Sequence, residues 1–427
     1  MIKISPVTKC EGMLIPPPDK SISHRALLLG AVAFGKSEII NLSSADDVQT
    51  TQKALMTLGK KIYDTKSSVT IEGKGFSEGK ECTIDCRNSG TTARMIMGLL
   101  APEKVFIRII GDDSLTNRPM ERVISPLKRM GASITYLDRF GYLPVNLKGQ
   151  DLHGVRYKLP VPSAQVKSAL LLAGLKAKGG TTIIEPRPTR DHTERMLNMM
   201  EADILIKRSD SGSEIRINPS ELSNFKMKIP GDFSSAAYFM ALAALCPGKG
   251  LTISDVNLNP TRLGFLEALR AMGMSIRMDL DDVTPEPVGK IFINGGSLNA
   301  VVIDADKVPY MIDEVPLLAV VATQAKGKTI IRGAEELRMK EADRIGSLVE
   351  GLIKMGASIE ATEDGFIIEG PTLLKGATLN PHGDHRLAMC FTVAASIANS
   401  DSIIKNEECV SISYPVFYQD FNRLTLL

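Results

Sequence analysis

The segment MGASI at residues 130–134 decides the fold, because variants of it recur along the chain. Each variant has an apolar residue, mostly followed by glycine, which is typical of a helix end. The residues after it are typical of the start of a strand. The other copies are LGKKI at 58–62, MEADI at 200–204, MGMSI at 272–276 and a second MGASI at 355–359. Their regular spacing predicts a repeat protein with one such junction in most units.

Upstream of these junctions lies a second recurring feature, a small or polar residue that opens an apolar helix. Helices that are apolar nearly all round, such as SALLLAGL at 168–175, favour burial inside sheets. Strand-like runs such as GTTIIEP at 180–186 follow them. The sequence therefore predicts six α/β units, the sixth without its second helix, whose first helices open at Ser21, Ser89, Ser163, Ser234, Asp313 and His385.

The composition is that of a globular protein. The 427 residues carry 51 Lys and Arg against 49 Asp and Glu, and a net charge of +2 gives no argument for nucleic acid or anionic membranes. The longest apolar run, ALLLGAVAF at 26–34, is too short to span a membrane, and no signal or transit peptide is visible, so we expect a cytoplasmic chain. The six cysteines and five histidines lack the spacing of a metal site, and no metal is expected.

The segment GAVAFGKS at 30–37 matches the phosphate-binding pattern GxxxxGK[ST]. Such a loop has to follow a strand and open a helix, whereas this segment closes one helix and leads into the strand-like run SEIINL at 37–42. We therefore interpret it as a helix end and expect no nucleotide there.

Three equivalent helix starts in the first half each combine hydroxyls with a cation. A helix N-terminus offers free N–H groups and partial positive charge to an anion, although a solvated cap would explain any one of them alone. Their repetition favours a shared anion site, to which loop arginines Arg118 and Arg190 would add bidentate contacts. The groups are Lys20, Ser21 and Arg25, then Ser89, Gly90 and Arg94, then Ser163, Gln165 and Lys167.

In the second half carboxylates join the cations. Helical charge spacing or an N-cap would be the plain interpretation of these residues. Carboxylates among cations are also what acid–base chemistry on an anionic substrate requires, since the cations hold the ligand while the carboxylates move protons. The residues are Asp313 and Glu314, then Lys340, Glu341 and Arg344, then Asp384, His385 and Arg386.

Seven segments resemble the family of 5-enolpyruvylshikimate-3-phosphate synthases, and the resemblance runs through all six repeats, so that it spans nearly the whole chain. They are PPPDKSISHRALLL (16–29), NSGTTAR (88–94), LTNRPM (115–120), VPSAQVKSALLLA (161–173), GDFSSAAYF (231–239), ELRMKEADRI (336–345) and HGDHRLAM (382–389). The resemblance implies an inside-out α/β barrel of two domains with three βαβαββ repeats each. The domains would be 19–229, and 1–18 with 230–427, around a cleft that holds the active site and closes by induced fit.

The reaction that the resemblance implies is transfer of the enolpyruvyl group of phosphoenolpyruvate to the 5-hydroxyl of shikimate 3-phosphate. Phosphate is released, no cofactor takes part, and the product leads towards chorismate and the aromatic amino acids. The implied catalytic residues are Lys20, Asp313, which would take the hydroxyl proton, and Glu341, which would protonate the methylene carbon. The enzyme would be a monomer without nucleic-acid or membrane partners, and the target of glyphosate.

The same resemblance implies two sets of substrate contacts. Those to shikimate 3-phosphate are Lys20, Ser21, Arg25, Ser163, Ala164, Gln165, Arg190, Asp313 and Lys340. Those to phosphoenolpyruvate are Lys20, Gly90, Arg118, Gln165, Arg344 and Arg386.

Three positions depart from the best-known enterobacterial pattern. Arg190 stands in place of a tyrosine and Glu336 in place of an asparagine, and near Ser411 a phosphoenolpyruvate-binding lysine is missing. Together with SAQVKS at 163–168, these departures are typical of a divergent bacterial class that is sometimes tolerant to glyphosate. Gly90 keeps the small residue beside the herbicide, so tolerance does not follow from the sequence.

Two alternative functions compete with this one. The sister family that transfers enolpyruvyl to UDP-N-acetylglucosamine typically has Lys-Asn where this chain has Lys20-Ser21, and a reactive cysteine where it reads GDDSLTNRPM at 111–120. A non-catalytic binder of phosphorylated ligands or nucleic acid predicts a basic surplus and gives no purpose to Asp313 and Glu341.

Overall fold

The computed structural model describes residues 1–65, 67–209, 212–246 and 248–426. The chain divides into two compact units, residues 18–229 and residues 1–17 with 230–427. Among the described residues, the unit 18–229 contains three four-stranded sheets and the other unit contains two, together with a three-stranded and a two-stranded sheet. The five four-stranded sheets are built by one rule. The first strand runs parallel to the second, and the third and fourth run antiparallel to their neighbours, as in β7-β8-β10-β9.

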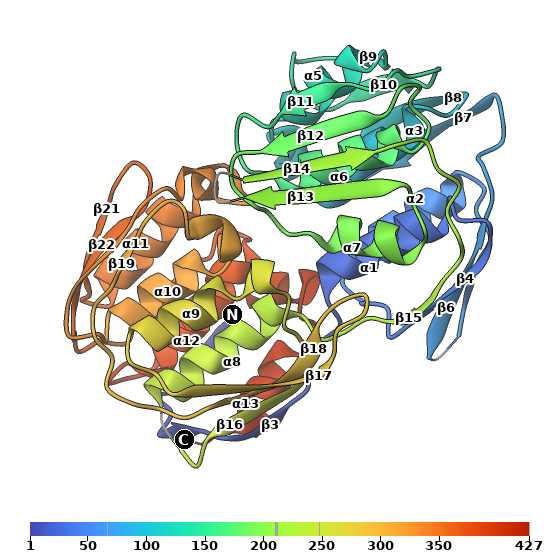
Figure 1. Cartoon of the computed structure of the whole chain (residues 1–427). Helices are drawn as coiled ribbons and strands as arrows, with labels where there is room; N and C mark the ends of the chain where they lie inside the picture. The colour runs from blue at the N-terminus through green and yellow to red at the C-terminus, as the bar shows by residue number, and fades with distance from the viewer. Residues whose placement is uncertain (66, 210–211, 247, 427) are drawn as a thin grey trace. The chain divides into compact units, whose positions relative to one another are not determined.

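The unit 18–229 holds three complete repeats (Figure 1). The first has β15 (Lys226–Lys228), β4 (Gly35–Ile40), β6 (Ser68–Gly73), β5 (Ile62–Asp64), α1 (Lys20–Gly30) and α2 (Asp46–Thr57). The second has β7 (Lys80–Asp85), β8 (Val105–Ile110), β10 (Val145–Lys148), β9 (Ser133–Tyr136), α3 (Gly90–Leu100), the short α4 (Asp113–Thr116) and α5 (Glu121–Arg129). The third has β11 (Arg156–Lys158), β12 (Thr181–Glu185), β14 (Gly212–Ile217), β13 (Ile204–Ser209), α6 (Ala164–Gly174) and α7 (His192–Met199).

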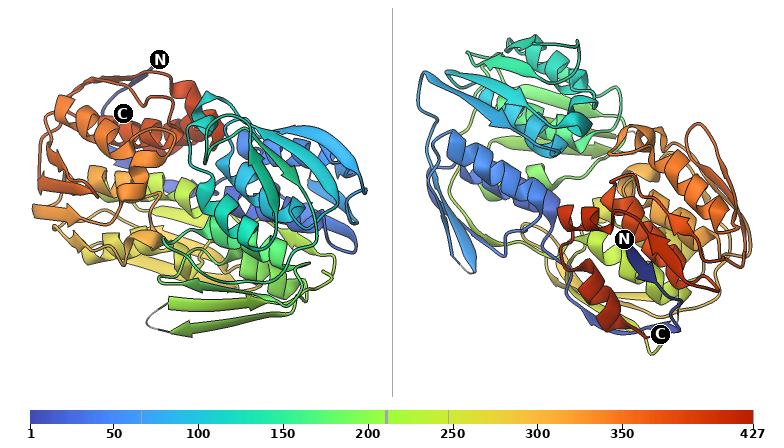
Figure 2. Two further views of the ribbon diagram at one scale, coloured as in Figure 1. Left: turned by 90° about the horizontal axis from the view of Figure 1, so that it is seen from above. Right: turned by 180° about the vertical axis from the view of Figure 1, so that it is seen from behind.

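The other unit takes strands from both ends of the chain, whose marked termini lie within it (Figure 2). Its first repeat has β3 (Gly12–Leu14), β16 (Leu251–Asn257), β18 (Val288–Ile293), β17 (Ile276–Asp282), α8 (Phe233–Leu245) and α9 (Gly264–Ala271). The second has β19 (Val302–Ile303), β20 (Gly327–Ile331), β22 (Phe366–Gly370), β21 (Ser358–Ala361), α10 (Val315–Ala322) and α11 (Arg344–Lys354). The third has β23 (Thr378–Leu379), β24 (Ser402–Ile404), α12 (His385–Ser396), α13 (Phe417–Leu424) and β1 (Ile2–Ile4), while β2 (Lys9–Cys10) pairs with β25 (Thr425–Leu426).

The expectation that the sixth repeat lacks its second helix is wrong. Helix α13 occupies that place and buries Phe417, Phe421 and Leu424, but it ends in LTLL rather than in a copy of MGASI. The sheet is completed by the N-terminus, because β1 pairs antiparallel with β24 and matches Ile2 to Ile404. The repeat is therefore present but is assembled from both ends of the chain.

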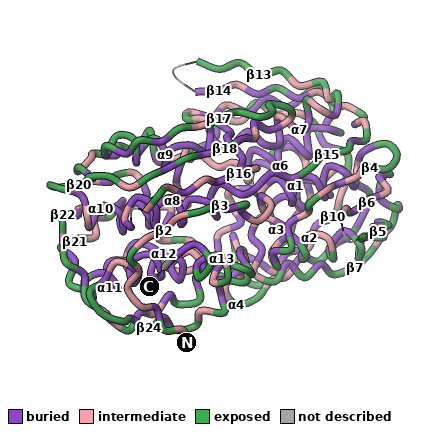
Figure 3. The backbone as a smooth tube through the Cα atoms, turned by 90° about the horizontal axis from the view of Figure 1, so that it is seen from below, coloured by how far each residue is buried: buried purple, intermediate pink, exposed green. Residues whose placement is uncertain are grey.

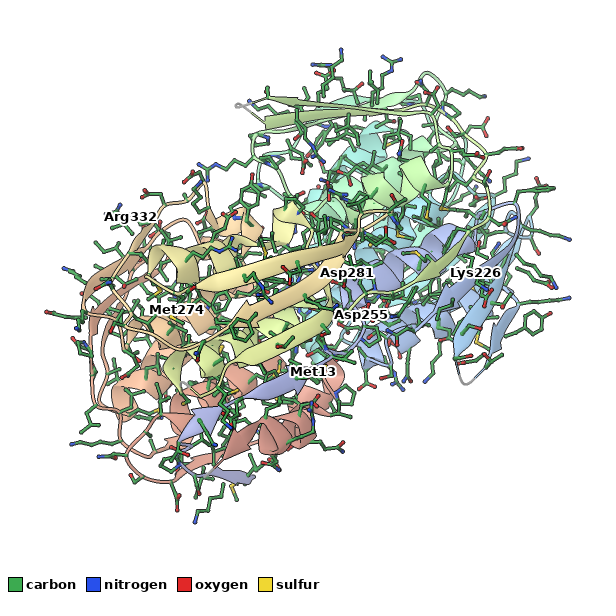
Figure 4. The ribbon with its side chains drawn as sticks, turned by 60° about the horizontal axis from the view of Figure 1, so that its bottom comes forward. Met13, Lys226, Asp255, Met274, Asp281 and Arg332 are labelled. Atoms are coloured by element: carbon green, nitrogen blue, oxygen red, sulfur yellow. The ribbon has the colours of Figure 1, made fainter. Side chains whose placement is uncertain are left out.

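The first helix of each repeat is central and its sheet is outside. Helices α3, α8, α10 and α12 are buried along almost every residue, as the purple tubes of Figure 3 show for α8 and α12. The sheets turn one face outward, and Met13 and Asp281, labelled in Figure 4, are exposed on β3 and β17. This is the inside-out arrangement expected from helices that are apolar all round.

The helix starts differ from the predicted ones at three places. Ser89 and Ser163 cap α3 and α6, and α12 begins at His385 after its cap Asp384, as expected. Helices α1 and α8 are capped by Asp19 and Asp232, each two residues earlier than predicted. The N-cap residue of α10 is Glu314 rather than Asp313, and its side chain makes no capping bond. Aspartate is the cap at these helices because its carboxylate accepts hydrogen bonds from the free N–H groups of the first turn and complements the positive end of the helix dipole. The segment 30–37 does close α1 at Gly30 and open β4 at Gly35, as its interpretation as a helix end requires.

Candidate active site

Within the unit 18–229, side-chain hydrogen bonds join the first turns of α3 and α6. Arg94 Nη1 donates to Gln165 Oε1 at 2.7 Å, and Gln165 Nε2 donates to Thr91 Oγ1 at 2.9 Å. Arg94 Nη2 also donates to Pro119 O at 3.2 Å. The amide of Gln165 is therefore oriented by partners on both of its ends.

Gly90, the first residue of α3, lies directly against this network. A Cβ atom there would lie 2.8 Å from Arg94 Nη1 and 3.6 Å from Arg118 Nη1. Arg118 is buried and is held by Asn88, whose Oδ1 accepts from Nη2 at 2.6 Å, and by Ser114. Glycine thus leaves the helix N-terminus open beside two guanidinium groups, an arrangement whose chemistry suits an anion.

The first turn of α1 carries Lys20, Ser21 and, one turn later, Arg25. Lys20 Nζ forms an ion pair with Asp47 Oδ2 of α2 at 2.8 Å and keeps part of its side chain exposed. Arg25 is buried and donates to Ser21 O, to Thr193 Oγ1 of α7 and to Ser168 Oγ of α6 at 2.7–2.9 Å. Its guanidinium therefore fixes α1 against both neighbouring helices.

A buried hydroxyl chain that sequence reasoning missed supports the same surface. His24 Nδ1 is hydrogen-bonded to Thr51 Oγ1 at 2.7 Å, and Thr51 Oγ1 to Thr92 Oγ1 at 2.6 Å. Thr92 Oγ1 lies 2.7 Å from Ser89 Oγ, the N-cap of α3. Burial lowers the pKa of His24 to about 3, so this ring is neutral and acts as a structural group. In the sequence, the only signal for this hydrogen-bonded chain was a histidine one turn inside an apolar helix.

The third helix start corrects one expectation. Ser163 caps α6 by accepting from Val166 N, and Ala164 and Gln165 form its first turn. Lys167 does not belong to the anion-facing group: it is fully buried and pairs with Glu185 and Glu194. Arg190 lies half-buried in the loop before α7.

In the unit that contains residues 230–427, Arg344 is the centre of a carboxylate cluster. Its Nε donates to Asp384 Oδ2 at 2.7 Å, and its Nη2 to Glu341 Oε2 at 2.5 Å. Nη1 lies 3.5 Å from Asp313 Oδ1. Burial disfavours the guanidinium, but Asp384 and Glu341 outweigh it and raise the pKa of Arg344, which is a permanent cation.

Arg386 completes this cluster from the first turn of α12. Its Nη2 lies 3.5 Å from Asp313 Oδ2, so the two oxygens of Asp313 face two guanidinium groups. Its Nη1 lies 4.0 Å from Glu314 Oε1, and Glu314 is buried and accepts from Ser234 Oγ. Ser234 Oγ in turn accepts from the buried Arg262 at 2.6 Å, a link that no sequence motif indicated.

Lys340 lies half-buried beside the cluster, at the end of a short 3-10 turn, Glu335–Met339. Burial lowers the pKa of the Lys340 ammonium, although Asp313 and Glu336 oppose this shift. Ser411 is exposed in another 3-10 turn, Glu407–Ile412, where its hydroxyl donates to Glu408 O. Each unit therefore presents cations at helix N-termini, and the second unit adds carboxylates that can exchange protons.

Comparison with known proteins gives one consistent result. The family model described as EPSP synthase (3-phosphoshikimate 1-carboxyvinyltransferase) matches residues 4–421. The 3-phosphoshikimate 1-carboxyvinyltransferase of Thermotoga neapolitana is 43% identical over 100% of both chains, and that of Thermodesulfovibrio yellowstonii is 45% identical over 96% of both.

Solved structures agree with these relatives. The EPSP synthase of Acinetobacter baumannii matches with a TM-score of 0.85 and 37% identity, over 99% of this chain and 98% of that one. The enolpyruvyl transferase NikO from Streptomyces tendae matches with a TM-score of 0.78 over 99% and 96%, but at 16% identity it supports the fold alone.

Proposed function

Because the chain belongs to the EPSP synthase family and transfers the enolpyruvyl group of phosphoenolpyruvate to shikimate 3-phosphate, we propose that the residues described above carry this reaction. The observation that supports this assignment best is the pair of preorganised cation sites, around Gly90 in one unit and around Arg344 in the other. Both substrates are polyanions, and such sites bind them without reorganisation. The family assignment removes the alternatives of a UDP-N-acetylglucosamine transferase and a non-catalytic binder.

Phosphoenolpyruvate would be held by guanidinium and amide groups that are already fixed. Gln165 is oriented by Arg94 and Thr91, and Arg118 by Asn88, so each loses little freedom on binding. The full set is Lys20, Gly90, Arg118, Gln165, Arg344 and Arg386, which supplies positive charge for both the phosphate and the carboxylate.

Shikimate 3-phosphate would be held mainly by the helix starts α1 and α6 and by the loop before α7. These elements are joined to each other through Arg25, which supports their acting as one surface. The set is Lys20, Ser21, Arg25, Ser163, Ala164, Gln165 and Arg190, with Asp313 and Lys340 from the other unit.

The proton transfers are assigned to Asp313 and Glu341. Asp313 takes the proton of the attacking 5-hydroxyl, and Glu341 protonates the methylene carbon, which gives a tetrahedral intermediate; Lys20 stabilises the negative charge of the phosphate that leaves. As the phosphate departs, one proton of the new methyl group returns to Glu341, which restores the double bond, and the proton held by Asp313 leaves with the phosphate. Both carboxylates contact Arg344, and an incoming anion competes for that guanidinium and releases them for proton exchange.

Deuterium exchange tests these roles directly. In D2O the wild-type enzyme with both substrates is expected to place deuterium in the methylene group of the product while it releases phosphate. Glu341→Gln should reduce both signals at least about 100-fold, whereas Glu360→Gln, an exposed carboxylate of β21 in the same unit, should change neither. Normal turnover by Glu341→Gln would show that another group protonates the carbon.

We also propose a monomer in the cytoplasm. Among the described residues, no helix is both long and apolar enough to cross a membrane. Sedimentation of the purified chain tests the oligomeric state.

A further inference from the structure

Lys167 lies in the second turn of α6 at the centre of a buried ionic cluster that the proposed mechanism does not use. Its Nζ is 2.6 Å from Glu194 Oε1 of α7 and 3.0 Å from Glu185 Oε2 at the end of β12. It also reaches Thr189 O at 3.5 Å, and Thr189 Oγ1 donates to Glu185 Oε1 at 2.5 Å. The exposed fractions of Lys167, Glu185 and Glu194 are 0%, 2% and 3%.

Stability alone is a poor account of this cluster. Burial raises the pKa of Glu185, and the charge of Glu194 adds to this effect while Lys167 opposes it. Burial also disfavours the ammonium of Lys167, but Glu194 and Glu185 outweigh it and raise its pKa. Well-packed apolar side chains are commonly as stable as such a buried ion pair, or more so. The cluster does, however, fix the spacing between α6, the end of β12 and α7.

Those elements carry candidate contacts to one substrate. Next to Lys167 on α6, Ser168 is hydrogen-bonded to Thr193 at 2.6 Å, and both bind the guanidinium of Arg25. Thr189, which the cluster holds through its carbonyl and its hydroxyl, is followed by Arg190. The first turn of α6 carries Ser163, Ala164 and Gln165.

We infer that Lys167, with Glu185 and Glu194, is a positioning residue for shikimate 3-phosphate, which holds the loop 186–191 and α7 in register with the first turn of α6. The inference rests on the proposed binding of this substrate by Arg25, Arg190 and the start of α6. It gives the SAQVKS segment at 163–168 one physical role: Ser163 to Gln165 meet the substrate, and Lys167 anchors the loop that carries Arg190.

The test uses steady-state kinetics, direct binding of shikimate 3-phosphate, and thermal melting of two variants. Lys167→Met leaves two buried carboxylates without their cation, whereas Glu194→Gln keeps the shape and leaves one lysine with one carboxylate. Both are expected to raise the Kd and KM for shikimate 3-phosphate, Lys167→Met by about tenfold or more, with KM for phosphoenolpyruvate within about twofold. Glu194→Gln remains decisive if Lys167→Met does not fold.

Lys60→Met is the matched control. Lys60 is a buried lysine of the same unit that donates to the carbonyls of Lys74 and Gly75, beyond the C-terminal end of α2. The Lys60→Met substitution should lower the melting temperature without changing the KM for shikimate 3-phosphate or the KM for phosphoenolpyruvate. A stable Glu194→Gln enzyme whose Kd and KM for shikimate 3-phosphate equal those of the wild type would overturn the inference. The proposed function would still stand in that case, provided that the wild-type enzyme releases phosphate. Absence of phosphate release by the wild type would instead refute the function itself.

Discussion

Gly90→Ala tests whether the open N-terminus of α3 is the phosphoenolpyruvate site. The added Cβ would lie 2.8 Å from Arg94 Nη1, about 0.6 Å closer than an ordinary contact of roughly 3.4 Å. Arg94 is buried and holds Gln165 at 2.7 Å and Pro119 O at 3.2 Å, so its guanidinium cannot move without stretching one of these bonds.

The expected magnitude follows from the bond that is put at risk. A hydrogen bond to a charged group contributes about 1.5–3 kcal/mol, and partial loss of about 1–2 kcal/mol corresponds to a factor of roughly 5–30. We therefore expect KM for phosphoenolpyruvate to rise by about 5–30-fold. The KM for shikimate 3-phosphate should change less, because the contacts proposed for this substrate also come from α1 and the loop before α7.

Steady-state phosphate release at varied phosphoenolpyruvate, with saturating shikimate 3-phosphate, measures this effect. Gly75→Ala is the control, because a Cβ at Gly75 meets nothing within 4 Å. An unchanged KM for phosphoenolpyruvate in a folded Gly90→Ala enzyme would refute the steric argument. A selective rise in KM for shikimate 3-phosphate would mean that Gly90 borders the other substrate.

Three further predictions concern titratable side chains. Asp384→Asn removes the carboxylate that accepts from Arg344 Nε, so KM for phosphoenolpyruvate should rise and urea titration should show a loss of about 3–5 kcal/mol. Asp313→Asn should lower kcat by about 100-fold or more with little change in melting temperature, measured by phosphate release and calorimetry. His24 has a pKa lowered from 6.5 to about 3 in the folded protein, so below pH 6.5 the unfolded chain binds the extra proton. Its contribution to stability is complete above pH 6.5 and falls by about 1.4 kcal/mol per pH unit between pH 6.5 and about pH 3. This part of the slope should be absent in His24→Asn, and its persistence there would show that another group is responsible.

The repeat could be predicted from the sequence, because MGASI-like junctions and apolar helices are local patterns. The completion of the last repeat could not be predicted, since β1 and β24 lie 398 residues apart even in the pairing of Ile4 with Ser402, and short strands carry no signal for distant partners. The helix caps were displaced by one or two residues for a related reason: serine and aspartate both cap helices, and only the fold decides which is used.

It was harder to predict which cations face a ligand and which have a structural role, because the sequence does not show how deeply each side chain is buried. Lys20 and Arg386 occupy the first and second positions of their helices, where side chains reach past the helix end, and they keep 18% and 12% of their side chains exposed. Arg25, Arg94 and Lys167 lie at the fourth position of their helices or beyond, and are buried.

Arg344 breaks this rule for a specific reason. It is the first residue of α11 and yet is buried, because the fully buried Asp384 at the start of α12 accepts from its Nε at 2.7 Å and draws it inward. A charged partner on a neighbouring helix can thus override position along the helix, at the desolvation cost that any buried pair carries. The motifs located these cations in the sequence, whereas their proposed division into ligand-binding and positioning groups depends on which carboxylates the fold brings beside them.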